Sequence, residues 1–99
     1  MANIQTEKAI IRKDKNIDEL VVFYLETPAN KGFITCNAIT ENGTVWSGSE
    51  ASIEFYHSTS KATEEEIAKA EMAILNTYDI KLDVKHKLQQ KYLTNIWSK

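Results

Sequence analysis

Residues 20–25 read LVVFYL, and this run constrains the fold more than any other stretch of the chain. β-Branched and aromatic residues favour a β-strand, and successive side chains of a strand point to opposite faces. Because apolar side chains fall on both faces of this strand, both faces must be covered. We therefore predict a central strand with a helix on one face. On the other face we expect a second copy of the chain, and hence a homodimer.

Three further strands are predicted around the central one. Residues 5–13 precede it, and residues 33–40 follow it after a turn at residues 27–32, TPANKG, where proline, asparagine and glycine favour turn conformations. Residues 51–57, ASIEFYH, are expected to be the fourth strand, with alternate apolar residues on one face.

The dipeptide Asn-Gly at 42–43 predicts a hairpin between the last two of these strands. A two-residue type I′ turn needs a positive φ at both positions, which these two residue types tolerate. Counting outward from such a turn places Ile39 opposite Trp46. Gly48 is expected to mark a bulge or bend in the second strand of the hairpin.

Two helices are predicted in the last third of the chain. Thr63 and Glu66 have the spacing of a capping box, which starts a helix over 63–78. Apolar residues recur at every fourth position of 84–97, which favours a second amphipathic helix, and the alternation in 80–84 adds a short fifth strand as an alternative. The predicted fold class is α+β: a four-stranded, or with this segment five-stranded, mostly antiparallel sheet with both helices packed on it.

The composition, 42% apolar and 26% charged, is that of an ordinary globular protein, and we expect a single domain over residues 1–99. No apolar run approaches the roughly 18 residues that a membrane span needs. The N-terminal residues lack the apolar core of a signal peptide. Cys36 is the only cysteine, so no intrachain disulfide can form. The expectation is a cytoplasmic protein without membrane contact.

The charges are distributed unevenly along the chain. Residues 33–78 contain seven acidic and two basic residues, whereas residues 79–99 contain two acidic and five basic residues. Solvated helix surfaces explain such a pattern. It also fits an acidic patch for a basic partner, or a basic tail for an acidic partner.

Four glutamates of the predicted helix 63–78 need separate explanations. Glu64, Glu65 and Glu66 lie about 100° apart around the helix axis and cannot converge on one ion, whereas a helix N-terminus favours all three. Glu71 falls in the middle of the apolar arc. Its carboxylate either pairs with a side chain of the sheet or second helix, lies at the rim of a narrow buried face, or is a functional acid in a cleft.

No catalytic or metal-binding motif is present in the sequence. His57 and His86 do not have the spacing of zinc ligands, and Cys36 alternates with apolar residues as a small buried side chain does. We therefore predict no catalytic residue, no metal ligand and no cofactor. A small hydrolase would require Glu71, His57 and Cys36 to come together, and it is the third alternative for function.

Several aromatic residues are candidates for surface contacts. Tyr24, Trp46, Tyr56 and Trp97 could stack bases as sheet-based RNA binders do, but Arg12 is the only arginine, and the region around Trp46 is acidic. Trp97 either closes the core or is an exposed anchor for a partner, and both alternatives stay open.

The stretch from residue 60 to residue 75 resembles the last part of a double-stranded-RNA-binding domain. The residues in step with that family are Ser60, Lys61, Ala68, Ala70, Ala73 and Leu75. The family's second lysine is absent, since Ala62 and Thr63 precede the glutamates, and no helix precedes the first strand. No RNA-binding residue is therefore carried over.

The chain also resembles, in general build, small phage-encoded accessory proteins, including some of the anti-CRISPR type. The similarity rests on residues 25–46, LETPANKGFITCNAITENGTVW, as a hairpin followed by the T-E-E-E helix start at 63–66. The resemblance covers about half of the chain. It implies a protein without catalytic activity that blocks a host complex by surface contact.

The leading hypothesis is a non-enzymatic protein-interaction module, which inhibits a host defence or nucleic-acid-handling complex. The candidate partner contacts, chosen as acidic or aromatic residues able to meet a basic groove, are Glu41, Glu50, Glu54, Glu64, Glu65, Trp46 and Trp97. The alternative is a nucleic-acid-binding module. Its candidate contacts are the basic residues Lys81, Lys85, Lys87 and Lys91.

Overall fold

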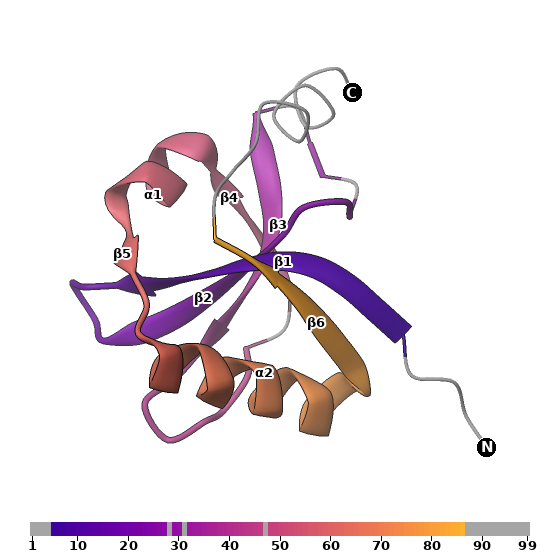
Figure 1. The fold of residues 1–99 in the computed structure, drawn as a ribbon. Helices are drawn as coiled ribbons and strands as arrows, with labels where there is room; N and C mark the ends of the chain where they lie inside the picture. Colours follow the sequence, from indigo (N-terminus) through magenta and orange to yellow (C-terminus); the bar gives the residue numbers. More distant parts are fainter. Residues whose placement is uncertain (1–4, 28, 31, 47, 87–99) are drawn as a thin grey trace.

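The chain folds around a six-stranded sheet with one helix on each face (Figure 1). The structure is a computed structural model, and it describes residues 5–27, 29–30, 32–46 and 48–86. The elements in chain order are β1 (Gln5–Asp14), β2 (Glu19–Tyr24), β3 (Phe33–Ile39), β4 (Ser49–Ser52), α1 (Ile53–Ser58), β5 (Ser60–Lys61), α2 (Glu64–Tyr78) and β6 (Ile80–Lys85).

The sheet is mostly antiparallel, with the strand order β4-β3-β2-β1-β5. β1 is long enough to hold two strands on its other edge: residues 5–10 pair in parallel with β6, and residues 12–13 pair antiparallel with β5. The predicted α+β class is confirmed. The segment 80–84, the alternative fifth strand, is part of β6, and the two-residue β5 is an addition that the sequence analysis did not predict.

Both faces of β2 are buried, as the LVVFYL run requires. Val22 and Tyr24 belong to a core cluster with α2, whereas Val21, Phe23 and Leu25 belong to a second cluster with α1. None of the five side chains is more than 6% exposed. The second cover, expected to be another subunit, is therefore a helix of the same chain.

The helix α1 occupies the residues for which a fourth strand was predicted, so that prediction is wrong for residues 53–57. Ser52 ends β4 and accepts a hydrogen bond from the backbone N–H of Phe55 at 3.1 Å, which is a helix N-cap. Ile53 and Tyr56, one helical turn apart, are buried, and the Tyr56 ring meets Phe23 edge-on at 5.0 Å. Contact with the second face of β2, the face that α2 does not cover, therefore overrides the strand propensity of this segment.

The second predicted helix, over 84–97, is wrong at its start. Val84 and Lys85 lie in β6, because parallel pairing with β1 buries Leu82 and packs Val84 against the α2 cluster. The rest of the predicted helix lies outside the described residues.

The hairpin at 42–43 is present, but its turn is not of type I′. Gly43 has a φ of 89°, whereas the φ of Asn42 is not positive. The carbonyl of Thr40 accepts from the N–H of Gly43, and the N–H of Thr40 donates to Thr44, both at 2.9 Å. This is a three-residue loop with glycine at the left-handed position.

The longer loop shifts the register by one residue next to the turn. Ile39 pairs with Val45 and not with Trp46 as predicted. Farther from the turn, Cys36 pairs with Ser49, so the second strand uses one more residue than the first over this distance. The extra residue is a β-bulge, the feature that the glycine at 48 led us to expect.

Arg12 joins the end of α1 to the sheet. Its guanidinium donates from Nη2 to the carbonyl of Thr59 at 2.6 Å and from Nε to the hydroxyl of Thr59 at 3.0 Å. It also lies 5.3 Å from the centroid of the Tyr56 ring. The only arginine of the chain is thus a structural residue that fixes the cover of the second core.

We expect Arg12→Met to reduce the free energy of unfolding by about 2 kcal/mol, because it removes two charge-assisted hydrogen bonds and leaves the Thr59 carbonyl without this donor. Urea unfolding measures the change. Lys15→Met, at an exposed position of the β1–β2 turn, is the matched control. A wild-type midpoint for Arg12→Met would contradict the assigned role.

The predicted capping box of α2 is confirmed. Glu66 donates its backbone N–H to the hydroxyl of Thr63 at 3.2 Å, and its carboxylate accepts from the backbone N–H of Thr63 at 2.8 Å. Lys13 lies 3.2 Å from the same carboxylate. The hydrogen bond from the Thr63 N–H, aided by Lys13, holds the pKa of Glu66 below its ordinary value.

We expect Glu66→Gln to lose stability less steeply than the wild type on acidification. A carboxyl group whose pKa is lower in the folded state stabilises the fold above its unfolded pKa of about 4.3, and this contribution is lost as the pH falls through the folded-state pKa. Urea midpoints measured between about pH 7 and about pH 3 follow the loss. Glu65→Gln, outside the capping box, is the control, and equal slopes for Glu66→Gln and wild type would contradict the prediction.

Candidate functional site

The face of the sheet that packs on α2 extends beyond the end of this helix. α2 ends at Tyr78, where Asp79 takes a left-handed conformation with a φ of 58° and donates its N–H to the carbonyl of Leu75 at 2.9 Å. The chain then turns directly into β6. The end of the sheet face next to Tyr78 is therefore left without helical cover.

The side chains of this face change from apolar to polar where the cover ends. In β1, the buried Ala9 and the polar Glu7 lie on the same face, two residues apart. In β3, the buried Ile39 shares this face with the polar residues Asn37 and Thr35. This change in the middle of two strands is visible in the sequence. It was not predicted as a site, because alternation of apolar and polar residues indicates which side chains are buried and not where the cover of a sheet ends.

A hollow of about 460 Å³ lies over this polar end. Its lining comes from β1, β2, β3, the end of α2, the start of β6 and two connecting segments, and consists of Gln5, Glu7, Tyr24, Thr27, Thr35, Asn37, Gly48, Tyr78 and Ile80. These described residues include one carboxylate and no basic side chain. We call this feature the Tyr24 hollow.

The hydroxyl group of Tyr24 is buried and has no hydrogen-bond partner in the part of the chain that the structure describes. Burial raises the pKa of this phenol, and Tyr78 and Glu7 raise it further by electrostatic interaction. The hydroxyl is therefore protonated at neutral pH. Tyr24, Tyr78 and Glu7 all line the hollow, so the buried hydroxyl belongs to a residue of its lining and has two further lining residues as electrostatic neighbours.

The carboxylate of Glu7 is held in place at the same wall. It accepts from Nε2 of Gln5 at 2.9 Å and from the hydroxyl of Thr27 at 3.4 Å. A carboxylate has about four acceptor positions, so two hydrogen bonds leave it able to accept more.

Asn37 connects the hollow to the hairpin. The bulge between Val45 and Ser49 takes the carbonyl of Trp46 out of the strand ladder, and Nδ2 of Asn37 donates to this carbonyl at 2.9 Å. Asn37 is 5% exposed, so its amide is a buried polar group with a defined partner. The Trp46 backbone and the Tyr24 hollow are thus parts of one continuous surface.

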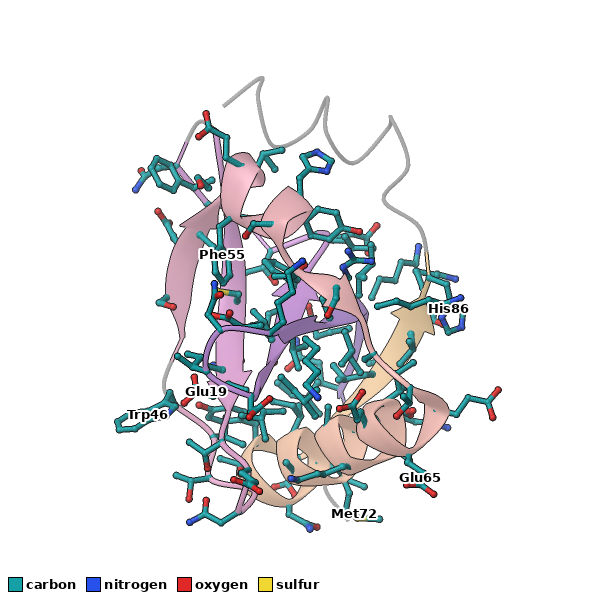
Figure 2. All side chains as sticks on the ribbon, turned by 90° about the vertical axis from the view of Figure 1, so that its left-hand side faces the viewer. Glu19, Trp46, Phe55, Glu65, Met72 and His86 are labelled. Atoms are coloured by element: carbon teal, nitrogen blue, oxygen red, sulfur yellow. The ribbon has the colours of Figure 1, made fainter. Side chains whose placement is uncertain are left out.

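The side chain of Trp46 points away from the body of the protein (Figure 2) and is 59% exposed. It lines a shallow, open depression together with the hairpin residues Thr40, Glu41, Asn42 and Thr44. Lys69 donates to the backbone carbonyl of Glu41 and thereby joins the hairpin to α2, while the Glu41 side chain stays exposed. An exposed tryptophan beside a carboxylate is suited to contact with a basic partner.

The other predicted contacts do not gather around Trp46. Glu50 accepts from the backbone and side-chain amides of Asn30 at 3.2 and 2.8 Å, so it also holds the β2–β3 connection. Glu54 lies in the first turn of α1, and Glu64 and Glu65 lie in the first turn of α2. Figure 2 shows Glu65 on the opposite side of the view from Trp46. Trp97 lies outside the described residues.

Glu71 is half-buried and not buried in the core. Among the described residues of α2 only Ala70 and Ile74 are buried, so the buried face is narrower than the apolar arc, as one of the three alternatives proposed. Glu71 and Lys81 line an open hollow of about 470 Å³ between α2 and β6. Within the described residues the Glu71 carboxylate makes no hydrogen bond or ion pair.

The three side chains of the hydrolase alternative are not brought together. Cys36 is buried in the α1 cluster, with Ser49 at 3.6 Å, whereas Glu71 is on α2, on the other face of the sheet. Burial raises the pKa of the Cys36 thiol. His57 is exposed on α1 beside the Tyr56 ring.

Within residues 5–86, apart from the three undescribed positions, no group of three or more histidine, cysteine or acidic side chains is arranged to hold a metal ion. In the same part of the chain, no helix is long and apolar enough to cross a membrane.

The lysines of the nucleic-acid alternative are only partly described. Lys81 and Lys85 lie on β6, with Asp83 between them, and Lys85 is 3.3 Å from the Asp83 carboxylate. Lys87 and Lys91 lie outside the described residues.

Comparison with known proteins gives no relative for this chain. No family model matches it, and no curated protein and no solved structure is similar to it at a significant level.

The two most buried polar side chains of the hollow should respond in opposite directions to truncation. Asn37→Ala leaves the Trp46 carbonyl unpaired, and we expect it to reduce the free energy of unfolding by about 1–3 kcal/mol. Tyr24→Phe removes a buried hydroxyl for which the described residues provide no partner, and we expect it to leave stability unchanged or to raise it by about 1 kcal/mol. Urea unfolding of both variants makes the comparison, and a marked loss of stability in Tyr24→Phe would show that the hydroxyl has a partner.

Proposed function

We propose that this chain is a non-enzymatic protein-interaction module that binds a basic surface of a partner protein through the hairpin around Trp46. The observation that carries the proposal is the exposure of Trp46 beside Glu41, on a hairpin that Lys69 and Asn37 hold to the rest of the fold. A tryptophan presented by a fixed backbone loses little conformational freedom on binding, which favours it as a binding hot spot.

The charge of the segment that carries Trp46 supports a basic partner. Residues 33–78 contain seven acidic and two basic residues, within a chain whose net charge is −2. Among the described residues, the acidic residues Asp18, Glu26, Glu66 and Asp83 have a lysine within 4 Å. A surface with excess negative charge speeds association with a positive one and disfavours contact with nucleic acid. The Lys85–Asp83 pair also argues against the nucleic-acid alternative.

We further propose that the partner is a host defence or nucleic-acid-handling complex, and that the chain is a phage or mobile-element inhibitor acting in the host cytoplasm. The support is the resemblance of residues 25–46 and 63–66 to small phage-encoded accessory proteins of the anti-CRISPR type. A protein of this kind acts by occupying a binding surface, which requires a fixed contact surface and no catalytic group.

We also propose a homodimer, but the structural reason differs from the apolar second face of β2 on which the sequence-based expectation rested. The second face of β2 is covered by α1, so the support now comes from β4, the outermost strand of the sheet order, whose Ser49 and Glu50 are exposed. An unpaired strand edge can pair with a second copy. Sedimentation equilibrium distinguishes the dimer from a monomer.

We expect Trp46→Ala to lose a partner that the wild type captures from a lysate of the host cell, as identified by mass spectrometry. Met72→Ala is the matched control, because Met72 is an equally exposed apolar side chain, at 57% against 59% for Trp46, on the outer side of α2 (Figure 2). With the purified partner, Trp46→Ala should weaken binding by roughly 30-fold, the effect of a typical hot spot. Equal capture by Trp46→Ala and wild type would contradict the proposal.

A further inference from the structure

The lining of the Tyr24 hollow includes hydrogen-bond acceptors, which suit a ligand that carries hydrogen-bond donors. Its lining includes Glu7, Tyr24 and Asn37. The Glu7 carboxylate and the Asn37 amide oxygen are acceptors by their chemistry, the Asn37 nitrogen donates to the Trp46 carbonyl, and the Tyr24 hydroxyl is buried behind the lining. No lysine, arginine or histidine is among the described lining residues. A bound anion would meet only the Glu7 charge, whereas a cation with several N–H groups would find acceptors.

The walls of the hollow also have apolar parts. The Tyr24 ring is 6% exposed and forms part of the floor, and Ile80 and Tyr78 stand at the side of α2 and β6. Tyr78 is 40% exposed, so its ring can move aside at little packing cost and open the Tyr24 hydroxyl. An occupant must therefore combine an apolar stem or flat face with a cationic, donor-rich end.

We propose that the Tyr24 hollow binds the guanidinium group of an arginine side chain of the partner protein. A guanidinium is planar, always charged, carries five N–H donors and lies well against aromatic rings. Its donors pair with Glu7, with the lone pairs of the Tyr24 hydroxyl and with the Asn37 oxygen. The hydroxyl, for which the described residues offer no hydrogen-bond partner, then has one.

Other occupants fit these groups less well. A metal ion needs several anionic or imidazole ligands, and Glu7 is the one carboxylate of the described lining. A lysine ammonium can satisfy Glu7, but it is a compact point charge that does not use the flat walls. A single arginine side chain occupies much less than the 460 Å³ of the hollow, so backbone atoms of the partner can enter with it.

This inference rests on the proposed function for the identity of the partner, since it makes the hollow the second contact of the surface that begins at Trp46. Asn37 bonds to the Trp46 carbonyl and lines the hollow, so one rigid segment positions both contacts. A partner that places a tryptophan-binding face and an arginine at this spacing would occupy both. The hollow itself is testable without the partner.

The test is a titration of the ¹⁵N-labelled full-length chain with N-acetyl-L-arginine methylamide, followed by NMR. We expect millimolar binding that shifts the amide signals of Gly48 and Ile80 and the side-chain signal of Asn37. The corresponding citrulline derivative, a neutral isostere, and the lysine derivative serve as ligand controls at the same concentrations. Equal binding of either control, or shifts that do not involve the hollow, would overturn the inference.

Two conservative variants then test the assigned groups. Glu7→Gln removes the charge and should weaken binding of the arginine derivative about tenfold, and Tyr24→Phe, which should fold at least as stably as the wild type, should weaken it several-fold. The matched controls are Glu54→Gln, an exposed glutamate of α1, and Tyr56→Phe, a tyrosine on the other face of the sheet. Wild-type affinity in both Glu7→Gln and Tyr24→Phe would overturn the inference.

The same variants separate this inference from the proposed function. Capture of a partner that needs Trp46 but is unaffected by Glu7→Gln would overturn the arginine site and leave the proposed function standing. Binding of the arginine derivative in the hollow, lost in Glu7→Gln, supports the site even where the Trp46-dependent capture fails.

Discussion

The burial of β2 on both faces is the constraint on which the rest of this structure depends. Side chains of neighbouring positions, such as Val22 and Phe23, point into separate cores, and neither core is closed by the sheet alone. Apolar burial is the main stabilising contribution in a domain of this size, so each face needs its own helix. α2 closes one core with a capped helix of 15 residues, and α1 closes the other with only 6. Arg12 compensates for this short helix by holding its end.

The helix α2 is shorter than the sheet face that it covers, and this difference in length produces the surface that we associate with function. α2 stops at Tyr78, and the strands beneath it change to polar residues beyond that point. The Trp46 side chain is exposed next to the β-bulge, and Nδ2 of Asn37 donates to the Trp46 carbonyl. An exposed aromatic residue, a hollow with unused acceptors and a fixed backbone segment therefore lie next to one another for structural reasons.

Much of the fold follows from local sequence patterns, and the errors have identifiable physical causes. The strands β1 to β3, the capping box of α2 and the position of the bulge depend on residues close together in sequence, and the predictions agree with the structure. The segment 53–57 satisfies both a strand alternation and the helical pair Ile53 and Tyr56, and packing against Phe23 on the second face of β2 decides between them. For the candidate site, Trp46 was predicted as a partner contact from its residue type and acidic surroundings, and the structure places its side chain at the surface. The Tyr24 hollow was missed, because it combines segments from residue 5 to residue 80.

By itself, the sequence determined that a two-sided central strand exists, that a capped helix starts after Thr63, and that the hairpin turns at Gly43. Each of these follows from side-chain alternation, a local hydrogen bond or the tolerance of glycine for a positive φ. The tertiary structure alone decided which segment covers the second face, that β6 pairs in parallel with β1, and that the Tyr24 hydroxyl is buried without a partner. For the hydroxyl, the missing partner is a statement about the described residues. All of these outcomes depend on contacts between residues far apart in the chain, which local patterns do not encode.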